Sequence, residues 1–285
     1  MLLDGAMGTE LIARGLDTRV EPPDAWNRSQ PEHVQSVHRA YFEAGAQAVL
    51  TNTFGSNRFR LAQFQRANDV RALNVAGALL AREVRPAGKL VIGDVGPTGA
   101  IPPPEGLADL TELEDAFAEQ AAALAEGGVD LVHIETMYHP KEARAALRGV
   151  RLGAPSLPVI VSMTCKATLG GTYATPLGFT PEAMLGVFLE ESADGVGINC
   201  TLPPAAMLDL VRFIRARTTL PVFAKPTAAP SANEHVSPRD MGTGALALLA
   251  VGASAVGGCC GTTPADIAVM RQALSAPPPL QNLAL

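Results

Sequence analysis

Eight short runs of apolar and β-branched residues recur along the chain, and this recurrence restricts the fold more than any other feature. Most of the runs are apolar at consecutive positions, which is typical of parallel strands buried on both faces. They are LLD (2–4), AVLTNT (48–53), LVIGDV (90–95), DLVHIE (130–135), PVIVSMT (158–164), GVGIN (195–199), PVFAKP (221–226) and SAVGGC (254–259).

Helical patterns occupy the segments between these runs. Residues 31–45 carry apolar side chains at helical spacing, and the pattern ends at Gly45. Thr111 and Glu114 have the spacing of a capping box before a second helical segment. Eight strands alternating with helices in 285 residues predict an α/β fold, the (β/α)8 TIM barrel. The alternative is an open doubly wound sheet, but no GxGxxG follows the first strand.

No linker or low-complexity segment divides the chain. We therefore expect a single barrel domain over residues 1–275, followed by a C-terminal tail at residues 276–285. The net charge of −6 favours neither nucleic acid nor an anionic membrane as a partner. No run is long and apolar enough to span a membrane, and the N-terminus lacks the basic region of a signal peptide, so we expect a cytoplasmic protein.

Polar residues stand where the predicted strands end, and strand ends form the catalytic face of such a barrel. Among them are Asp4 and Gly5, the segment Thr51–Thr53, Asp94, Glu135, Cys200, Lys225, Cys259 and Cys260.

The cysteines at two of these ends indicate a soft-metal site. Four cysteines in a chain of this size are no disulfide framework. Cys200, Cys259 and Cys260 could bind Zn²⁺ through three thiolates and leave the fourth position open, and the flanking glycines allow the required turn. We expect Cys165 to be a core residue. A second interpretation of the glycine-rich GGCCGTTP is a phosphate site built from backbone N–H groups.

Two acidic residues, Asp4 and Glu135, also end predicted strands. They could hold a substrate ammonium group, while Thr51, Thr53 and neighbouring N–H groups hold a carboxylate. The alternative is a carboxylate buried against a basic residue for structural reasons.

Three thiolates would cancel the zinc charge and leave about one net negative charge on the site. Such a zinc is a poor Lewis acid for carbonyls but can bind a substrate thiol as thiolate, although a free thiol with a pKa of about 8.5 is protonated at pH 7. The donor set therefore indicates thiol alkylation by displacement at carbon.

With these motifs in order, the chain resembles the homocysteine S-methyltransferase family. LLDGAMGTEL, TNTFGSN, VGPTG, IETM, GINC and GGCCGTTP carry the resemblance over nearly the whole length. It implies a homocysteine-binding TIM barrel that transfers a methyl group to homocysteine to form methionine. It also implies Zn²⁺ on Cys200, Cys259 and Cys260, the substrate amine on Glu135, and the amino-acid end near Asp4, Gly5 and Thr51.

The methyl donor stays open between a small molecule and a separate methyl-carrier protein. S-methylmethionine, a betaine-like onium compound and a methylated corrinoid or folate partner are the candidates. Gly55 and Thr136 stand where the betaine-using enzyme has tyrosines, so Trp26, Tyr138 and Tyr173 are the candidates for a different aromatic cage. Two further hypotheses are a barrel with structural zinc that acts on a phosphorylated small molecule, and a non-catalytic thiol-binding subunit.

Overall fold

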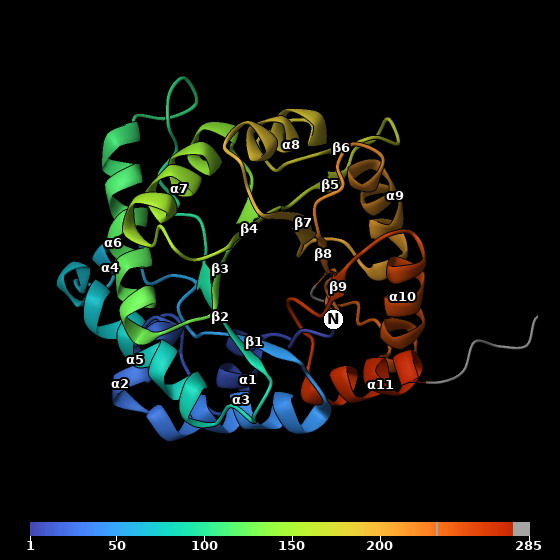
Figure 1. Ribbon diagram of the computed structural model, residues 1–285, viewed down its shortest axis with the longest axis horizontal. Helices are drawn as coiled ribbons and strands as arrows, with labels where there is room; N and C mark the ends of the chain where they lie inside the picture. The colour runs from blue at the N-terminus through green and yellow to red at the C-terminus, as the bar shows by residue number, and fades with distance from the viewer. Residues whose placement is uncertain (232, 276–285) are drawn as a thin grey trace, which may run out of the picture.

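The computed structural model describes residues 1–231 and 233–275. It shows a ring of parallel strands surrounded by helices (Figure 1). The strands follow one another around the ring in chain order. They are β1 (Ala48–Leu50), β2 (Leu90–Val95), β3 (Leu131–Met137), β4 (Val159–Met163), β7 (Gly195–Asn199), β8 (Val222–Lys225) and β9 (Ala255–Val256). All six pairings between neighbours are parallel.

The N-terminal segment closes the ring. Leu2 forms a parallel bridge with Val256 of β9, and Leu3 forms one with Ala48 of β1. The Leu3 amide donates to the Val256 carbonyl at 2.7 Å, and the Gln47 amide donates to the Leu2 carbonyl at 2.8 Å. The predicted (β/α)8 barrel is therefore confirmed, with its first strand reduced to two bridges.

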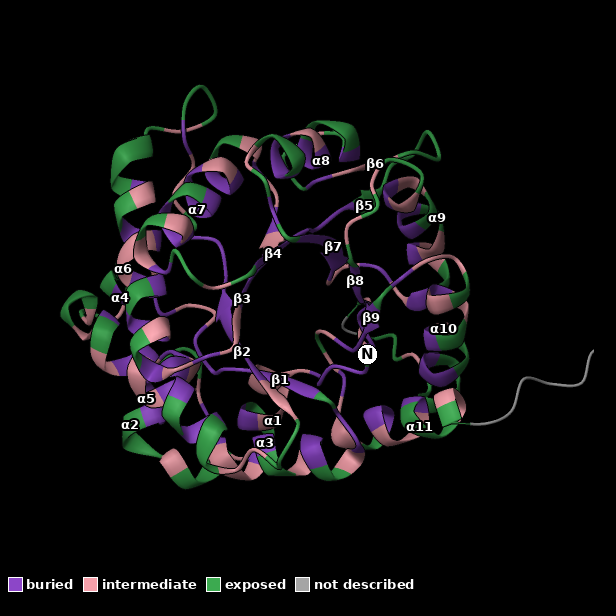
Figure 2. Cartoon of the chain, viewed as in Figure 1, coloured by how far each residue is buried: buried purple, intermediate pink, exposed green. Residues whose placement is uncertain are grey.

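Helices form the outer layer, and their buried faces point toward the strands (Figure 2). The helices are α1 (Met7–Ala13), α2 (Trp26–Ser29), α3 (Pro31–Ala44), α4 (Arg58–Ala62), α5 (Val70–Glu83), α6 (Leu110–Gly127), α7 (Pro140–Gly153), α8 (Pro181–Glu190), α9 (Pro204–Arg215), α10 (Pro238–Ala250) and α11 (Pro264–Ser275), with short 3₁₀ turns at Pro23–Ala25 and Ala67–Asp69. A small hairpin of β5 (Lys166–Ala167) and β6 (Tyr173–Ala174) follows β4. Within the described ranges, no helix has the length and hydropathy needed to cross a membrane.

The sequence pattern accounts for α3 but not for the start of α6. In α3 the apolar face is buried as predicted, and Gly45 ends the helix at φ 110°, a left-handed conformation that glycine adopts without a steric penalty. The predicted capping box at Thr111 and Glu114 is wrong. Asp109 is the N-cap of α6, because its carboxylate accepts from the amides of Thr111 and Glu112 at 2.8 and 3.2 Å.

The interior of the barrel changes from apolar to charged along the strands. An apolar cluster fills it first, made by Leu3, Ala48, Leu50, Ile92, Ile160, Phe223 and Ala255. Side chains alternate across a strand, so the residue two positions after an inward-facing one also faces inward. In this way Asp94 follows Ile92 on β2, and Lys225 follows Phe223 on β8. A charged layer therefore lies at the C-terminal ends of the strands.

Candidate functional site

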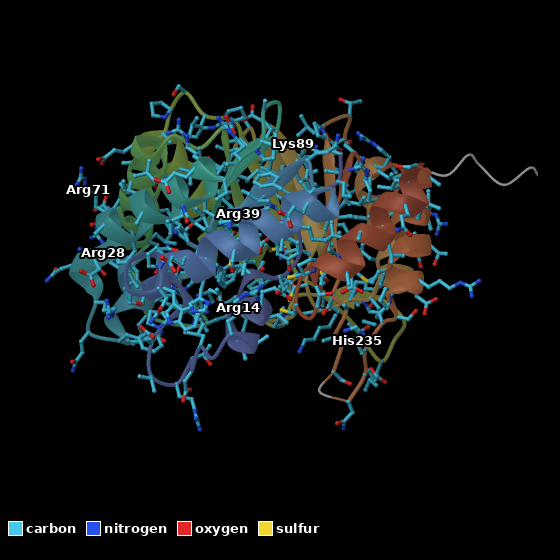
Figure 3. All side chains as sticks on the ribbon, turned by 90° about the horizontal axis from the view of Figure 1, so that it is seen from below. Arg14, Arg28, Arg39, Arg71, Lys89 and His235 are labelled. Atoms are coloured by element: carbon cyan, nitrogen blue, oxygen red, sulfur yellow. The ribbon has the colours of Figure 1, made fainter. Side chains whose placement is uncertain are left out.

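A cavity of about 480 Å³ opens at the C-terminal end of the barrel. Figure 3 shows the barrel from the side, with Lys89 just before β2 at one end and His235, in the loop after β8, at the other. The seven residues that the family resemblance assigns to zinc or homocysteine all line this cavity: Asp4, Gly5, Thr51, Glu135, Cys200, Cys259 and Cys260. The cavity thus collects residues from both ends and the middle of the chain.

Three cysteine sulfurs gather at one side of the cavity. The Sγ atoms of Cys200, Cys259 and Cys260 all lie within 4.8 Å of one another, and those of Cys200 and Cys260 are 3.6 Å apart. Cys200 directly follows β7 with φ 61°, and its amide donates to the Lys225 carbonyl at 3.0 Å. Three converging thiols without a disulfide suit a soft divalent ion such as Zn²⁺.

A glycine allows the cysteine pair to lie this close to the N-terminal segment. The Gly258 amide donates to the Asp4 carbonyl at 2.9 Å, and a Cβ atom at the preceding Gly257 would lie 2.7 Å from Cβ of Leu3 and 2.8 Å from the Asp4 carbonyl oxygen. The next amide, that of Cys259, donates to the Pro226 carbonyl at 2.8 Å. The backbone that carries both thiols is therefore fixed on two sides.

The thiols retain their protons more strongly than a free cysteine does. For Cys200, a hydrogen bond with Cys259 lowers the pKa, but a hydrogen bond with Cys260 and burial raise it by more. The pKa of Cys200 is therefore raised to about 11. For Cys260, a hydrogen bond with Cys200 lowers the pKa, while Cys259 and burial raise it to about 12. A metal ion must therefore displace protons when it binds these three groups.

Cys165 is separate from this group. Its side chain is fully buried in the main hydrophobic cluster and does not line the cavity. Burial raises the pKa of its thiol to about 12. The prediction that it is a core residue is confirmed.

A buried ion pair dominates the charged layer. Nζ of Lys225 donates to Oε2 of Glu135 at 2.6 Å, and both side chains are less than a tenth exposed. Burial lowers the pKa of Lys225, but Glu135, Asp4 and Asp94 raise it by more, so the ammonium group stays charged. Burial raises the pKa of Asp4 to about 7 and that of Asp94 well above its usual value, while Lys225 lowers both.

Asp4 and Gly5 hold the N-terminal segment against the barrel. Oδ2 of Asp4 accepts from the Leu50 amide at 2.7 Å, while its Oδ1 has no partner among the described residues. A Cβ atom at Gly5 would lie 2.9 Å from both Oη of Tyr41 and Cγ2 of Thr262. Close packing thus requires glycine here.

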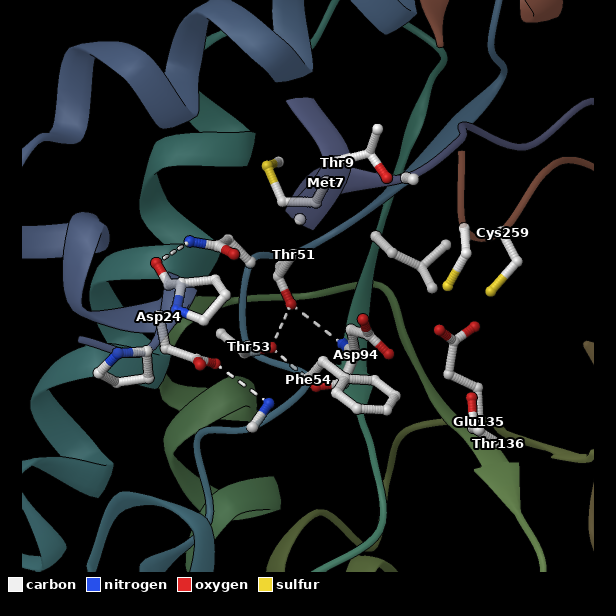
Figure 4. A pocket seen from close by; sticks show the side chains of 18 of the residues that line it. Met7, Thr9, Asp24, Thr51, Thr53, Phe54, Asp94, Glu135, Thr136 and Cys259 are labelled. Carbon is white, nitrogen blue, oxygen red and sulfur yellow. Dashed lines mark hydrogen bonds between the residues drawn. The ribbon is translucent and has the colours of Figure 1, made fainter. Parts of the chain in front are cut away.

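The hydroxyl of Thr51 belongs to a chain of hydrogen bonds at the top of β2. The Asp94 amide donates to Thr51 Oγ1 at 3.0 Å, and Thr53 Oγ1 donates to the Asp94 carbonyl at 2.8 Å. The two hydroxyls are 2.6 Å apart, so Thr51 donates to Thr53 (Figure 4). This chain fixes the backbone of Asp94, whose carboxylate lines the cavity.

Asn199 is a site residue that the sequence analysis did not select. Its Oδ1 accepts from the Thr136 amide at 2.8 Å, and its Nδ2 donates to Thr136 Oγ1 at 2.7 Å. Thr136 has φ 64° within an irregularity of β3, directly after Glu135. Asn199 stands at a strand end in the sequence, as the selected residues do, and this position was the available signal.

The proposed aromatic cage is not present in the described part of the chain. None of Trp26, Tyr138 and Tyr173 lines the cavity. Trp26 donates to Glu21 and packs on His33, and the Tyr173 hydroxyl donates to the Ala206 carbonyl. The aromatic residues of the cavity wall are Phe54 and Phe64 instead.

Comparison with known proteins agrees with this geometry. Residues 1–274 match the family model described as homocysteine S-methyltransferase. The chain is 33% identical over 300 residues to methionine synthases from Mycobacterium tuberculosis and Mycobacterium leprae, with 96% of this chain covered. It spans about a quarter of the length of these relatives, 24% in both cases.

Solved structures show the same fold. The metallated form of the homocysteine methyltransferase MmuM from Escherichia coli aligns with a TM-score of 0.80 at 24% identity, covering 95% of each chain. The apo form of the same protein aligns with a TM-score of 0.74 at 25% identity, covering 96% of this chain and 95% of that one.

Proposed function

The chain belongs to the homocysteine S-methyltransferase family, and we propose that it is a zinc-dependent enzyme that methylates the thiol of homocysteine to form methionine. The observation that carries this proposal is the convergence of three cysteine sulfurs within 4.8 Å on the wall of a cavity that also contains carboxylates. The methionine synthase relatives and the E. coli homocysteine methyltransferase support it.

Cys200, Cys259 and Cys260 are the residues that would hold the metal. Bound there by three thiolates, Zn²⁺ would supply a way to keep a substrate thiol deprotonated at neutral pH without withdrawing all of its nucleophilicity. The chain's own contribution is to hold the three thiols on a fixed backbone next to the cavity.

The charged layer supports a role in binding the amino-acid end of homocysteine. A substrate ammonium group would meet Glu135, with Asp4 and Asp94 close by, and a substrate carboxylate would meet Lys225. Gly5 lets the N-terminal backbone approach this end. We assign Thr51 to the same end, where its hydrogen bonds hold Asp94 in place.

The phosphate alternative is less well supported. In residues 257–263, the amides of Gly257, Gly258, Cys259, Gly261, Thr262 and Thr263 donate to acceptors within the protein. These N–H groups are therefore not free to hold an anion.

Metal content and X-ray absorption test the proposal. The purified chain should bind a stoichiometric zinc ion with sulfur ligands, and adding homocysteine should increase the zinc–sulfur coordination. Cys200→Ala should abolish or strongly weaken zinc binding, while the buried Cys165→Ala, its matched control, should retain the metal. A zinc shell that does not change with homocysteine would contradict the proposal, and zinc loss in Cys165→Ala alone would contradict the ligand assignment.

A further inference from the structure

Lys225 places a positive charge inside the acidic part of the cavity. Of the described residues that line the cavity, only Arg60 and Lys225 are basic, and Nε of Arg60 donates to the Pro97 carbonyl at 3.3 Å. Figure 4 shows the carboxylates of Asp94 and Glu135 on the side of the cavity where Cys259 lies. Lys225 pairs with Glu135, so its charge belongs to the same side as the cysteines.

The ammonium group of Lys225 has hydrogen-bonding capacity to spare. A lysine ammonium group has three N–H donors. Nζ of Lys225 donates to Oε2 of Glu135 at 2.6 Å, which is its single hydrogen bond among the described residues. Only 3% of the residue is exposed, so an acceptor for the other two N–H groups must enter the cavity.

The backbone of Lys225 fixes its position relative to the thiols. The Cys200 amide donates to the Lys225 carbonyl at 3.0 Å, and Asn199 pairs with Lys225 between β7 and β8. The Cys259 amide donates to the carbonyl of Pro226, the next residue. A molecule whose sulfur reaches the cysteines therefore meets Lys225 at a position that the barrel backbone sets.

The Lys225 ammonium group lies beside Glu135, the residue that the proposed function assigns to the homocysteine amine. A second ammonium group bound to the Glu135 carboxylate would lie close to Nζ, which is 2.6 Å from Oε2. Two positive charges at such a separation repel, most strongly where little water screens them. An acceptor that carries only an amine therefore gains little from Glu135 as long as Lys225 is there.

A carboxylate on the same acceptor removes this obstacle. It would accept from the two remaining N–H groups of Lys225 and offset the repulsion. The acceptor's ammonium group would then donate to Glu135 and to Oδ1 of Asp4 and Asp94, two buried atoms that have no hydrogen-bond partner among the described residues. Positive and negative groups thus alternate between the protein and the acceptor.

A purely structural role explains Lys225 less well. A buried ion pair contributes little net stability, because the cost of desolvating two charges offsets their attraction. Lys225 lines the cavity, whereas Phe223, two residues earlier on β8, packs in the apolar interior of the barrel. The charge therefore lies at the end of the strand that a ligand reaches.

We propose that Lys225 is a specificity-determining residue that couples recognition of the acceptor's amine to recognition of its carboxylate. Its ammonium group holds Glu135 in the free protein, rejects thiols that carry only an amine, and admits thiols that carry both groups. This inference rests on the proposed function, because it takes a zinc-bound thiol as the acceptor. It deepens that function by assigning the choice of a zwitterionic acceptor to one residue.

Four thiols of equal chain length test the coupling. Homocysteine has both groups, 4-mercaptobutyrate lacks the amine, 3-aminopropane-1-thiol lacks the carboxylate, and propane-1-thiol lacks both. Calorimetric titration of the zinc-loaded full chain gives a dissociation constant for each thiol. We expect the amine to improve binding by a factor that is at least about tenfold larger when the carboxylate is present than when it is absent. An equal improvement in the two cases would overturn the proposal.

Substitution of the lysine separates its role from that of the carboxylates. In Lys225→Gln, 3-aminopropane-1-thiol should bind more tightly than in the wild type and 4-mercaptobutyrate more weakly, so that the ratio of their dissociation constants shifts at least about tenfold. Loss of packing or of zinc would instead weaken both ligands together. Lys225→Arg keeps the charge and should retain the wild-type coupling. Lys166→Gln is the matched control, because Lys166 is exposed on β5, does not line the cavity and should leave all four constants unchanged.

The outcomes distinguish this inference from the proposed function. If homocysteine enters the zinc shell but both single-group thiols change alike in Lys225→Gln, Lys225 has a structural role only and this inference fails alone. If Lys225→Gln does not fold, the coupling in the wild type and its retention in Lys225→Arg decide, and loss of the coupling in either protein overturns the inference. If homocysteine leaves the zinc shell of the wild type unchanged, the proposed function fails and this inference fails with it.

Discussion

Lys225 and Glu135 form an ion pair across the interior of the barrel, with Nζ and Oε2 2.6 Å apart. Lys225 ends β8 and Glu135 lies on β3, and two strands separate them in the sheet. Desolvation of two charges is costly, so the pair contributes to stability only as long as both partners are present.

We predict that Lys225→Met lowers the free energy of unfolding by about 3 kcal/mol or more at pH 7, because it leaves the Glu135 carboxylate buried without a counter-charge. Urea denaturation of the full chain measures this. Arg212→Met is the control, since it removes one partner of an exposed pair with Asp209 and should cost less than about 1 kcal/mol. Equal losses of unfolding free energy in the two variants would show that breaking the buried pair costs no more than breaking an exposed one.

We predict that Glu135→Gln weakens homocysteine binding about tenfold or more and leaves zinc binding intact, because a neutral amide no longer attracts the substrate ammonium group. Calorimetric titration with homocysteine and metal analysis of the same sample measure both quantities. Glu142→Gln is a matched control, since Glu142 is buried and bonded to Thr98 but does not line the cavity. Loss of zinc from Glu135→Gln would mean that Glu135 supports the metal rather than the substrate.

Asn199 is expected to act as a positioning residue. Asn199→Leu removes both hydrogen bonds that hold Thr136, so the irregular backbone after Glu135 loses its support. We expect a loss of about 2 kcal/mol in unfolding free energy and weaker homocysteine binding. Asn199→Asp keeps the acceptor for the Thr136 amide and should recover part of the binding. A variant that loses stability but binds homocysteine normally would restrict Asn199 to a structural role.

The sequence was sufficient to predict the strands and the residues at their ends. Buried parallel strands are apolar at consecutive positions, so all eight runs could be located, although the first forms only the bridges of Leu2 and Leu3. Strand ends meet on one face of such a barrel, and this rule alone brought Asp4, Glu135 and the three cysteines to one cavity.

The partners of these residues could not be predicted in the same way. The pairing of Lys225 with Glu135 depends on the register across β4 and β7, which one sequence does not encode locally. The aromatic cage was wrong because none of Trp26, Tyr138 and Tyr173 lines the cavity. The C-terminal tail, residues 276–285, lies outside the described residues. The capping box was wrong because Asp109, two residues earlier, is already a good N-cap.

The buried His38 of α3 makes stability depend on pH in a predictable direction. Its side chain is fully buried, and neither ring nitrogen has a partner among the described residues. Burial lowers the pKa of the imidazole from 6.5 to about 3. The unfolded chain therefore binds a proton between these two values while the folded chain does not. Above pH 6.5 the imidazole is neutral in both states, and burying it carries no protonation cost. As the pH falls from 6.5 toward 3, protonation of the unfolded chain lowers the stability of the folded protein.

We predict that His38→Leu gains stability relative to the wild type on acidification, by about 2 kcal/mol between pH 7.5 and pH 5. The difference between the two proteins is the quantity to measure, by urea denaturation at each pH, because the raised pKa of Asp4 acts in the opposite direction in both. His33→Leu is the control, since it replaces an exposed histidine of the same helix and so separates the effect of burial from that of losing a histidine. A constant difference for His38→Leu would show that His38 becomes protonated in the folded protein without cost.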